Sequence, residues 1–348
     1  MKQLLLVVFL AFSITITFAQ DIDKIINATE VERIERVLSA DDMLGRRTFT
    51  PGIDKAADFI AEEFKKAGLQ PANGKSFLQE FKMIRPKFIS ADGTINGAAI
   101  DSRNIVALTG KTDLSITQSS GYEKIKDEYV IFSGHYDHIG IGRPNAEKDS
   151  IFNGANDDAA GTTAVMLLAQ YFAKKKDNDR TIVFAAFTAE EIGGFGSQYF
   201  SKQFAPEKVM AMFNIEMIGT ESKWGTNSAY ITGYEKTDMG KILEKNLEGS
   251  KFKFYPDPYT KQNLFYRSDN ATLARLGVPA HTISTSRMEA DTTAYNKTID
   301  KYYHNQDDEI ETLDMKNMAE IIKAIAISST SIIAGKDTPS RVDTKDLR

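Results

Sequence analysis

Histidine and carboxylate side chains follow three apolar runs in the middle of the chain, and an acidic loop lies between the first two runs. In chain order these side chains are His135, Asp137, Asp157, Glu190, Glu191 and Glu216. Imidazole and carboxylate groups without sulfur are typical of catalytic zinc sites, whereas structural zinc sites rely on cysteine. The chain contains no cysteine, which excludes thiolate ligands, disulfides and thiol catalysis. The pattern therefore indicates a catalytic metal site.

Each motif follows a segment that reads as a strand buried on both faces. We predict such strands over 129–133, 181–187 and 209–215, and a helix over 158–173 behind the acidic loop. In open α/β sheets, ligands bind outside the carboxyl ends of the strands. We therefore expect the six side chains to converge on one edge of the sheet.

The remaining segments complete an α/β pattern without an internal repeat or a domain boundary. Apolar spacing predicts helices over 21–45, 55–67, 196–202, 238–247 and 313–333, and short strands over 77–83, 103–108 and 279–284. Alternating strands and helices favour a single α/β domain, in which helices cover both sides of a mixed, mostly parallel central sheet in three α/β/α layers.

Composition narrows the function classes. Hydrophobic residues make up 42% and charged residues 26% of the 348 residues, as in soluble globular proteins. The formal net charge of −5 argues against a nucleic-acid partner. The sequence also lacks a Gly-x-Ser-x-Gly nucleophile elbow and a phosphate-binding loop.

Both ends of the chain are predicted to lie outside the folded domain. Residues 1–19 are predicted to be a signal peptide, with Lys2 before an apolar core and a small-residue cleavage site that ends at Ala19. The apolar core is short for a membrane span, so we expect an exported protein, periplasmic or extracellular, without a stable membrane anchor after cleavage. Residues 20–335 form the predicted domain, and 336–348 a charged, loose tail.

Several motifs in sequence order resemble the M28 family of zinc aminopeptidases. They are His135-Tyr136-Asp137, the loop from Gly154 through Asp157-Asp158 to Gly161, Ala189-Glu190-Glu191, Tyr303-His304, and the lead-in from Ser39 to Arg46. The resemblance covers 37–313 and implies a fold of the zinc exopeptidase type that acts on peptide substrates and releases N-terminal residues.

The resemblance also implies a role for each motif residue. Two zinc ions per chain are expected: Asp157 would bridge them, His135 and Glu216 would complete one position, and Glu191 and His304 the other. Glu190 would be the general base. Asp137 would orient His135 from behind, as metal-bound imidazoles usually require.

Two positions depart from the family pattern. The family usually has Asp where this chain has Glu216, which puts the second zinc ion and its identity in question. It often has His where this chain has Asn270, and we interpret the neighbouring Asp269 as a support residue. His138 is interpreted as a loop residue, and His281 as part of the core or of a pocket wall.

Other interpretations remain open. The aromatic residues between 224 and 266 are expected to serve mainly in packing, and Tyr295 is a candidate for binding the substrate carbonyl. A glutaminyl cyclase or a carboxypeptidase on the same fold is the alternative among enzymes. An inactive metal- or peptide-binding homologue is the alternative outside them.

Overall fold

The computed structural model describes residues 22–72, 76–89, 95–108, 127–288 and 302–347. The predicted signal peptide and Tyr295 lie outside these residues. Among the helices described, none is long and apolar enough to cross a membrane.

One large mixed sheet forms the centre of the described structure. Its spatial order is β1 (Gln70–Pro71), β3 (Ile95–Leu108), β7 (Thr181–Phe187), β4 (Tyr129–His135), β8 (Val209–Ile215), β11 (Ala280–Ser284), β9 (Ser228–Ile231) and β10 (Lys253–Pro256), and β2 (Leu78–Ile89) also pairs with β3. The central strands β7, β4, β8 and β11 are parallel, while β3 and β9 join them antiparallel. The predicted mixed, mostly parallel sheet is confirmed. A separate pair joins β5 (Gly140–Ile141) and β6 (Ile151–Phe152).

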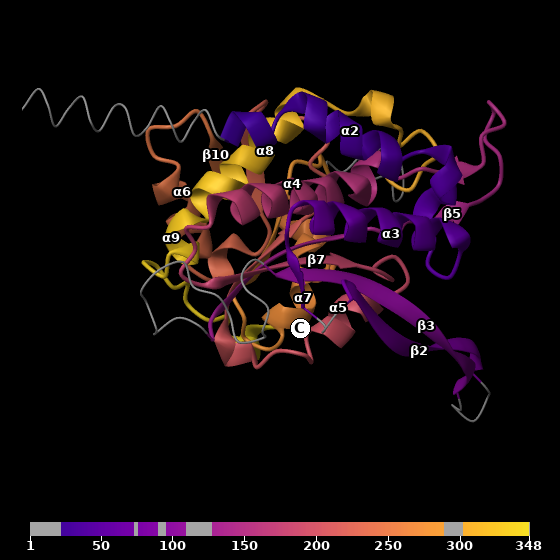
Figure 1. Ribbon diagram of the computed structural model, residues 1–348, viewed down its shortest axis with the longest axis horizontal. Helices are drawn as coiled ribbons and strands as arrows, with labels where there is room; N and C mark the ends of the chain where they lie inside the picture. Colours follow the sequence, from indigo (N-terminus) through magenta and orange to yellow (C-terminus); the bar gives the residue numbers. More distant parts are fainter. Residues whose placement is uncertain (1–21, 73–75, 90–94, 109–126, 289–301, 348) are drawn as a thin grey trace, which may run out of the picture.

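Helices cover both faces of this sheet, which confirms the three layers (Figure 1). One face carries α2 (Ala28–Leu38), α3 (Pro51–Lys66), α4 (Ala160–Lys175) and α8 (Met315–Ser328), with α6 (Met239–Asn246) and α9 (Thr330–Ile333) beside α8. The other face carries the shorter α5 (Phe195–Phe200) and α7 (Asn270–Ala274). Short 3-10 turns lie at Pro206–Lys208, Tyr234–Lys236, Thr260–Gln262, Leu264–Tyr266, Ile310–Thr312 and Thr344–Asp346.

Alternate residues of β4 supply both cores, as the two-residue period of a strand requires. Val130 and Phe132 pack into the core under α2, α3, α4 and α8. Ile131 packs into the second core, together with Phe200 of α5 and Leu273 of α7. Burial on both faces explains why the strand is apolar throughout.

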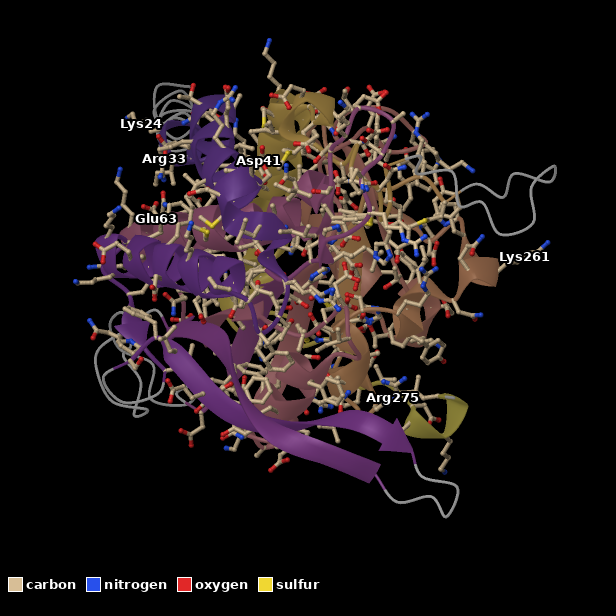
Figure 2. The ribbon with its side chains drawn as sticks, turned by 90° about the vertical axis from the view of Figure 1, so that its right-hand side faces the viewer. Lys24, Arg33, Asp41, Glu63, Lys261 and Arg275 are labelled. Atoms are coloured by element: carbon tan, nitrogen blue, oxygen red, sulfur yellow. The ribbon has the colours of Figure 1, made fainter. Side chains whose placement is uncertain are left out.

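An ion pair joins α2 and α3, between the exposed Arg33 and the buried Glu63. Arg33 of α2 and Glu63 of α3 lie side by side in Figure 2, and their charged groups are 2.7 Å apart. Glu63 also pairs with Lys66 at 2.9 Å. Burial would raise the pKa of Glu63, but these two cations hold it below its usual value.

The single helix predicted over 21–45 is wrong, because the segment divides into three pieces. Residues 22–25 are helical, α2 follows, and a 3-10 turn occupies Asp41–Arg46. The side chain of Asn27 caps α2 by accepting hydrogen bonds from the backbone N–H groups of Thr29 and Glu30. Gly45 has φ +62°, and a Cβ there would lie 2.5 Å from the carbonyl oxygen of Phe152, so glycine is required at this bend.

The hairpin formed by β2 and β3 is longer than predicted. The predicted strands over 77–83 and 103–108 are its base, and the ladder continues to the pair Ile89 and Ile95. Figure 1 shows this hairpin extending away from the helical layers. The outer half of the hairpin has no strict alternation of polar and apolar residues, so the sequence pattern indicated only the half that is attached to the sheet.

The region from 219 to 303 contains more regular structure than predicted. The expected α6 and β11 are present, but β9, β10 and α7 are additional. Each of these three has only four or five residues, too few for a periodic pattern to stand out.

The tail is packed rather than loose, contrary to the expectation for 336–348. Val342 is buried in the second core. Arg341 donates hydrogen bonds to the carbonyl oxygens of Val209 and Pro206, and the Ser340 N–H donates to Asp238. The charged composition of the tail gave no sign of its one apolar anchor or of these hydrogen bonds.

His281 of β11 is a buried core residue, as one of its two interpretations held. Its ring nitrogens lie 2.8 Å from the Thr232 carbonyl oxygen and 2.8 Å from the Thr237 hydroxyl. Burial lowers the pKa of His281 from 6.5 to about 4. The unfolded chain therefore binds this proton first, so the contribution of His281 to stability is complete above pH 6.5 and is lost as the pH falls towards 4.

We predict that His281→Gln reduces the loss of unfolding free energy between pH 7.5 and 4.5 by roughly 2–3 kcal/mol. The measurement is urea unfolding of wild type and variant at both pH values, in a chelator so that bound metal does not contribute. Parallel pH profiles of the two proteins would contradict the assignment.

Candidate metal centre

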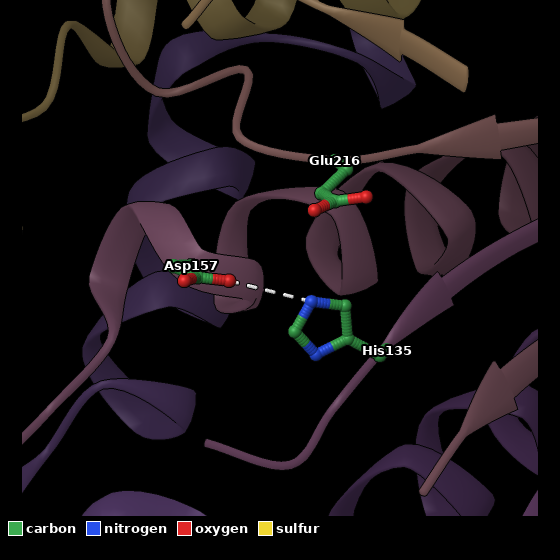
Figure 3. A group of neighbouring side chains, drawn as sticks. All are labelled: His135, Asp157 and Glu216. Atoms are coloured by element: carbon green, nitrogen blue, oxygen red, sulfur yellow. Dashed lines mark ion pairs between the residues drawn. The ribbon is translucent and has the colours of Figure 1, made fainter. Parts of the chain in front are cut away.

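Asp157 lies between two groups of histidine and carboxylate side chains. Its Oδ1 is 3.3 Å from Nε2 of His135, and its Oδ2 is 3.3 Å from Nε2 of His304. Glu216 completes the first group and faces both partners in Figure 3. Glu191 belongs to the second group, with Oε2 3.1 Å from Nε2 of His304. The structure thus brings all five predicted ligands together.

The donor atoms and their spacing fit zinc. Two ligands of one tetrahedral zinc ion, each bound at 2.0–2.1 Å, lie roughly 3.3 Å apart, close to the separations around Asp157. Asp157 Oδ2, Glu191 Oε1 and Glu216 Oε2 are also buried without a hydrogen-bond partner. Buried oxygens of this kind need a partner, and a divalent cation would supply it.

The predicted convergence at one sheet edge is confirmed. β4 ends at His135, Glu190 and Glu191 follow β7, and Glu216 follows β8 directly. Asp157 sits in a π-helical turn (Ala155–Ala159) that leads into α4, which begins two residues later than predicted. The 157–158 peptide bond in this turn is cis.

Asp137 supports the site in a different way from the one expected. Nδ1 of His135 lies 3.1 Å from the main-chain oxygen of Asp137, whereas the carboxylate of Asp137 is 3.8 Å away. That carboxylate accepts hydrogen bonds from the backbone N–H groups of Glu190 and Glu191, at 3.1 and 3.4 Å, and from the Thr48 hydroxyl. One residue therefore orients the first ligand and fixes the Glu-Glu loop.

Two further aspartates position the site, and sequence reasoning missed both. Asp308 accepts hydrogen bonds from the backbone N–H groups of Asn156 and Asp157, at 2.8 and 3.0 Å. Asp158 accepts hydrogen bonds from the backbone N–H groups of His135, Gly161 and Met217. Asp158 thus ties the ends of two strands to the start of α4. Apart from the local bond between Asp158 and Gly161, the partners of these bonds are far apart in sequence, and motif spacing carries no information about such bonds.

A buried arginine also holds the loops that carry Asp137 and Asp157. The guanidinium of Arg46 donates to the carbonyl oxygens of four residues: Leu38, Tyr136, Asn153 and Gly154. Two of them precede Asp157 by a few residues, and one lies next to Asp137. Since the Arg46 side chain is fully buried, these four acceptors satisfy a charge that water cannot reach.

The electrostatic balance of the site favours a cation. Burial alone would raise the pKa of Asp157, but His135 and His304 hold it well below its usual value. Burial raises the pKa of Glu216 to about 7 and that of Glu190 well above its usual value. Carboxylates that retain protons in this setting would release them to a bound divalent metal.

His138 lies on the loop that leaves β4, as interpreted, and its side chain also belongs to the second group. Its side chain is buried, with Nδ1 2.7 Å from Glu191 Oε1 and 3.9 Å from Asp157 Oδ2. The sequence contained a signal for this placement, because His138 follows His135 by only three residues on the loop that leaves β4. A loop that turns back towards the strand end brings both rings to the same site.

Asn270, where the family often has His, is a structural residue. Its amide donates to the carbonyl oxygens of Phe265 and Ala280, and its oxygen accepts from the Thr282 hydroxyl. The neighbouring Asp269 is buried, and burial raises its pKa to about 6. Its carboxylate oxygens have no hydrogen-bond partner within the described residues, so its support role stays a prediction.

A pocket opens above the two groups. The acidic side chains and His304 line its floor. Its walls are largely apolar and consist of Met217, Tyr230, Leu264, Met288 and Tyr303, with Thr232, Thr282, Ser284 and Arg267 adding polar groups. The aromatic region thus serves both purposes: Tyr230 lines the pocket, while Trp224 stacks on Tyr255 at 4.2 Å.

The chain belongs to peptidase family M28, whose model matches residues 116–328. A probable zinc metalloprotease of Pyricularia oryzae is 31% identical over 175 residues, which cover 50% of this chain and 31% of the relative. Aminopeptidase Y of Saccharomyces cerevisiae is 27% identical over 64% of this chain and 42% of its own length. The chain therefore spans less than half of the length of these curated relatives.

Solved structures share the fold at low sequence identity. A zinc aminopeptidase from Bacillus subtilis superposes with a TM-score of 0.66 at 15% identity, covering 93% of this chain and 99% of that one. The glutaminyl cyclase of Porphyromonas gingivalis gives a TM-score of 0.62 at 16% identity, covering 89% and 99%. Both likenesses confirm the predicted zinc exopeptidase type of fold.

We predict that Asp308→Asn weakens zinc binding by about 10–100-fold, the usual effect of losing a residue that orients a ligand. The amide presents one oxygen and an N–H₂ group to two backbone N–H donors, so one of the two bonds is lost. Isothermal titration with zinc measures the change, and the exposed neighbour substitution Asp307→Asn is the matched control. Equal affinities for all three proteins would remove Asp308 from the site.

Proposed function

We propose that this protein is a zinc-dependent aminopeptidase that releases N-terminal residues from peptides. The observation that supports the proposal is the placement of Asp157 between two histidine–carboxylate groups at the floor of a pocket. A carboxylate in this position suits two zinc ions at the short spacing of a two-metal site, roughly 3.5–4 Å. We propose His135, Asp157 and Glu216 for the first ion, and Asp157, Glu191 and His304 for the second.

When bound, zinc supplies Lewis acidity to the peptide carbonyl and lowers the pKa of a coordinated water. The chain's own residues complete the reaction. Glu190 lines the pocket but belongs to neither metal-binding group, so its carboxylate is free to exchange protons. It takes a proton from the attacking water and passes it to the amine that leaves. Burial raises the pKa of Glu190, so a proton taken from water is retained until the leaving amine accepts it.

The apolar pocket walls indicate which N-terminal residue is accepted. Met217, Tyr230 and Met288 pack together beside the floor of the pocket. They would contact the side chain next to the scissile bond. An uncharged apolar side chain gains burial there, whereas a carboxylate or ammonium group would lose its hydration.

Export is part of the proposal and rests on sequence alone. Residues 1–19 have the charged start, apolar core and small-residue end of a signal peptide. Peptides in the periplasm or outside the cell would then be the substrates.

We predict that purified protein loaded with zinc releases amino acids from aminoacyl amides, and that a chelator abolishes this activity until zinc is restored. Glu190→Gln should lower kcat by about 10²–10⁴-fold because the proton carrier is lost. Its zinc content should stay unchanged. The exposed Glu207→Gln serves as the matched control.

The same panel tests the alternatives when it includes peptides with N-terminal glutamine and peptides blocked at the N-terminus. Formation of pyroglutamate without amino-acid release would assign a glutaminyl cyclase. Release from the C-terminus of blocked peptides would assign a carboxypeptidase. An inert protein, unchanged by Glu190→Gln, would leave only a binding function.

We predict that leucine or methionine amides are preferred over aspartate and lysine amides. Met288→Ala should lower kcat/KM for leucine amide by about 10–200-fold, the range for lost apolar contacts in a pocket. Its effect on alanine amide should be small because alanine does not reach that wall. Comparing kcat/KM for the two substrates gives the test, and equal losses would place Met288 outside the side-chain pocket.

A further inference from the structure

We propose that His138 is a fourth protein ligand of the second metal ion, together with Asp157, Glu191 and His304. The inference rests on the proposed function only in requiring a cation at that position. It goes beyond it by assigning the position a closed set of four side chains.

The donor atoms of His138, Asp157 and Glu191 lie within 4.8 Å of one another, close enough to hold one ion. Each of the three residues also presents a buried atom without a hydrogen-bond partner: His138 Nδ1, Asp157 Oδ2 and Glu191 Oε1. A metal ion bound by these three atoms would give each of them the partner that it lacks.

His138 and Glu191 are in short contact. Nδ1 of His138 and Oε1 of Glu191 are 2.7 Å apart, while Nε2 of the same ring is buried without any hydrogen-bond partner. His281 provides the contrast within the same chain, because both of its ring nitrogens have partners at 2.8 Å. A buried imidazole kept for structure is satisfied in that way, and His138 is not.

His304 approaches the same two carboxylates from another side. The rings of His138 and His304 are 5.7 Å apart at an interplanar angle of 72°, so both can turn a nitrogen towards one ion without clashing. Their partners are divided as well: Oε1 of Glu191 faces His138, whereas Oε2 faces His304.

The surrounding main chain positions His138 and leaves space for its ring. The backbone N–H of His138 donates to the carbonyl oxygen of Arg46. Gly154 has φ +57°, and a Cβ there would lie 2.5 Å from the ring of His138. A glycine at this point leaves room for the imidazole beside the Asp157 loop.

A closed set of four ligands gives the two positions different tasks. Zinc sites with four protein ligands are typically structural, whereas catalytic sites keep an open place beside three ligands. The first position, with His135, Asp157 and Glu216, would therefore be the one that admits water or substrate. Glu216, where this chain departs from its family, would then act at the open position.

Cadmium-113 NMR of the whole protein tests the assignment directly. The chain has four histidines, so protein labelled with ¹⁵N at the imidazoles and loaded with cadmium-113 should give three rings with nitrogen–cadmium coupling. We expect coupling at Nδ1 of His138 and at Nε2 of His135 and His304, with none at His281. Absence of coupling at His138 would overturn the inference.

The outcome also separates this inference from the proposed function. Coupling at His135 and His304 without coupling at His138 would reject only the fourth ligand. Absence of coupling at His135 and His304 would reject the proposed two-metal site itself.

His138→Gln gives an independent readout of affinity. We expect competition with a zinc chelator to show the second ion bound more than about 100-fold more weakly, beyond the 10–100-fold typical of residues that only orient a ligand. The first ion should bind as in wild type, and His281→Gln should leave both affinities unchanged. A smaller loss for His138→Gln would assign it an orienting role instead and overturn the inference.

Discussion

The whole site depends on holding one carboxylate, that of Asp157, between two histidines. Each of its oxygens lies 3.3 Å from a different imidazole, so a shift of the loop in either direction would weaken one group. Asp308 fixes the backbone of this residue, Arg46 fixes the loop before it, and Asp158 anchors the strand ends around it. These supports come from three segments that are remote from one another in sequence.

Burial of negative charge is the second constraint. The sheet edge gathers several carboxylates from separate strands, and burial makes the ionised form of each unfavourable unless a cation or backbone N–H group faces it. Asp137 and Asp158 are satisfied mainly by N–H groups and act as struts. Glu191 and Glu216 retain a buried oxygen without a partner. This division separates the carboxylates that hold the loops in place from those that we propose as metal ligands.

The sequence predicted the parts of this protein that follow from periodicity and from strand ends. The central strands β4, β7 and β8 could be placed because apolar runs are local signals. The five candidate ligands could be named because the motif order resembles that of the family. Asp308, Arg46 and the true role of Asp137 could not, since their hydrogen bonds join segments that are remote in sequence. The sequence placed His138 on a loop but not its ring beside Glu191, because only the turn of that loop shows where the ring points.

The order of the ligands along the chain is also an order in time. During synthesis from the N-terminus, His135, His138, Asp157 and Glu191 are added well before His304, which follows Glu216 by 88 residues. Because domains tend to fold from the N-terminal side during synthesis, the sheet edge and its first donors can assemble while the late loop is still missing. His304 would then be the last of the proposed ligands to reach the site.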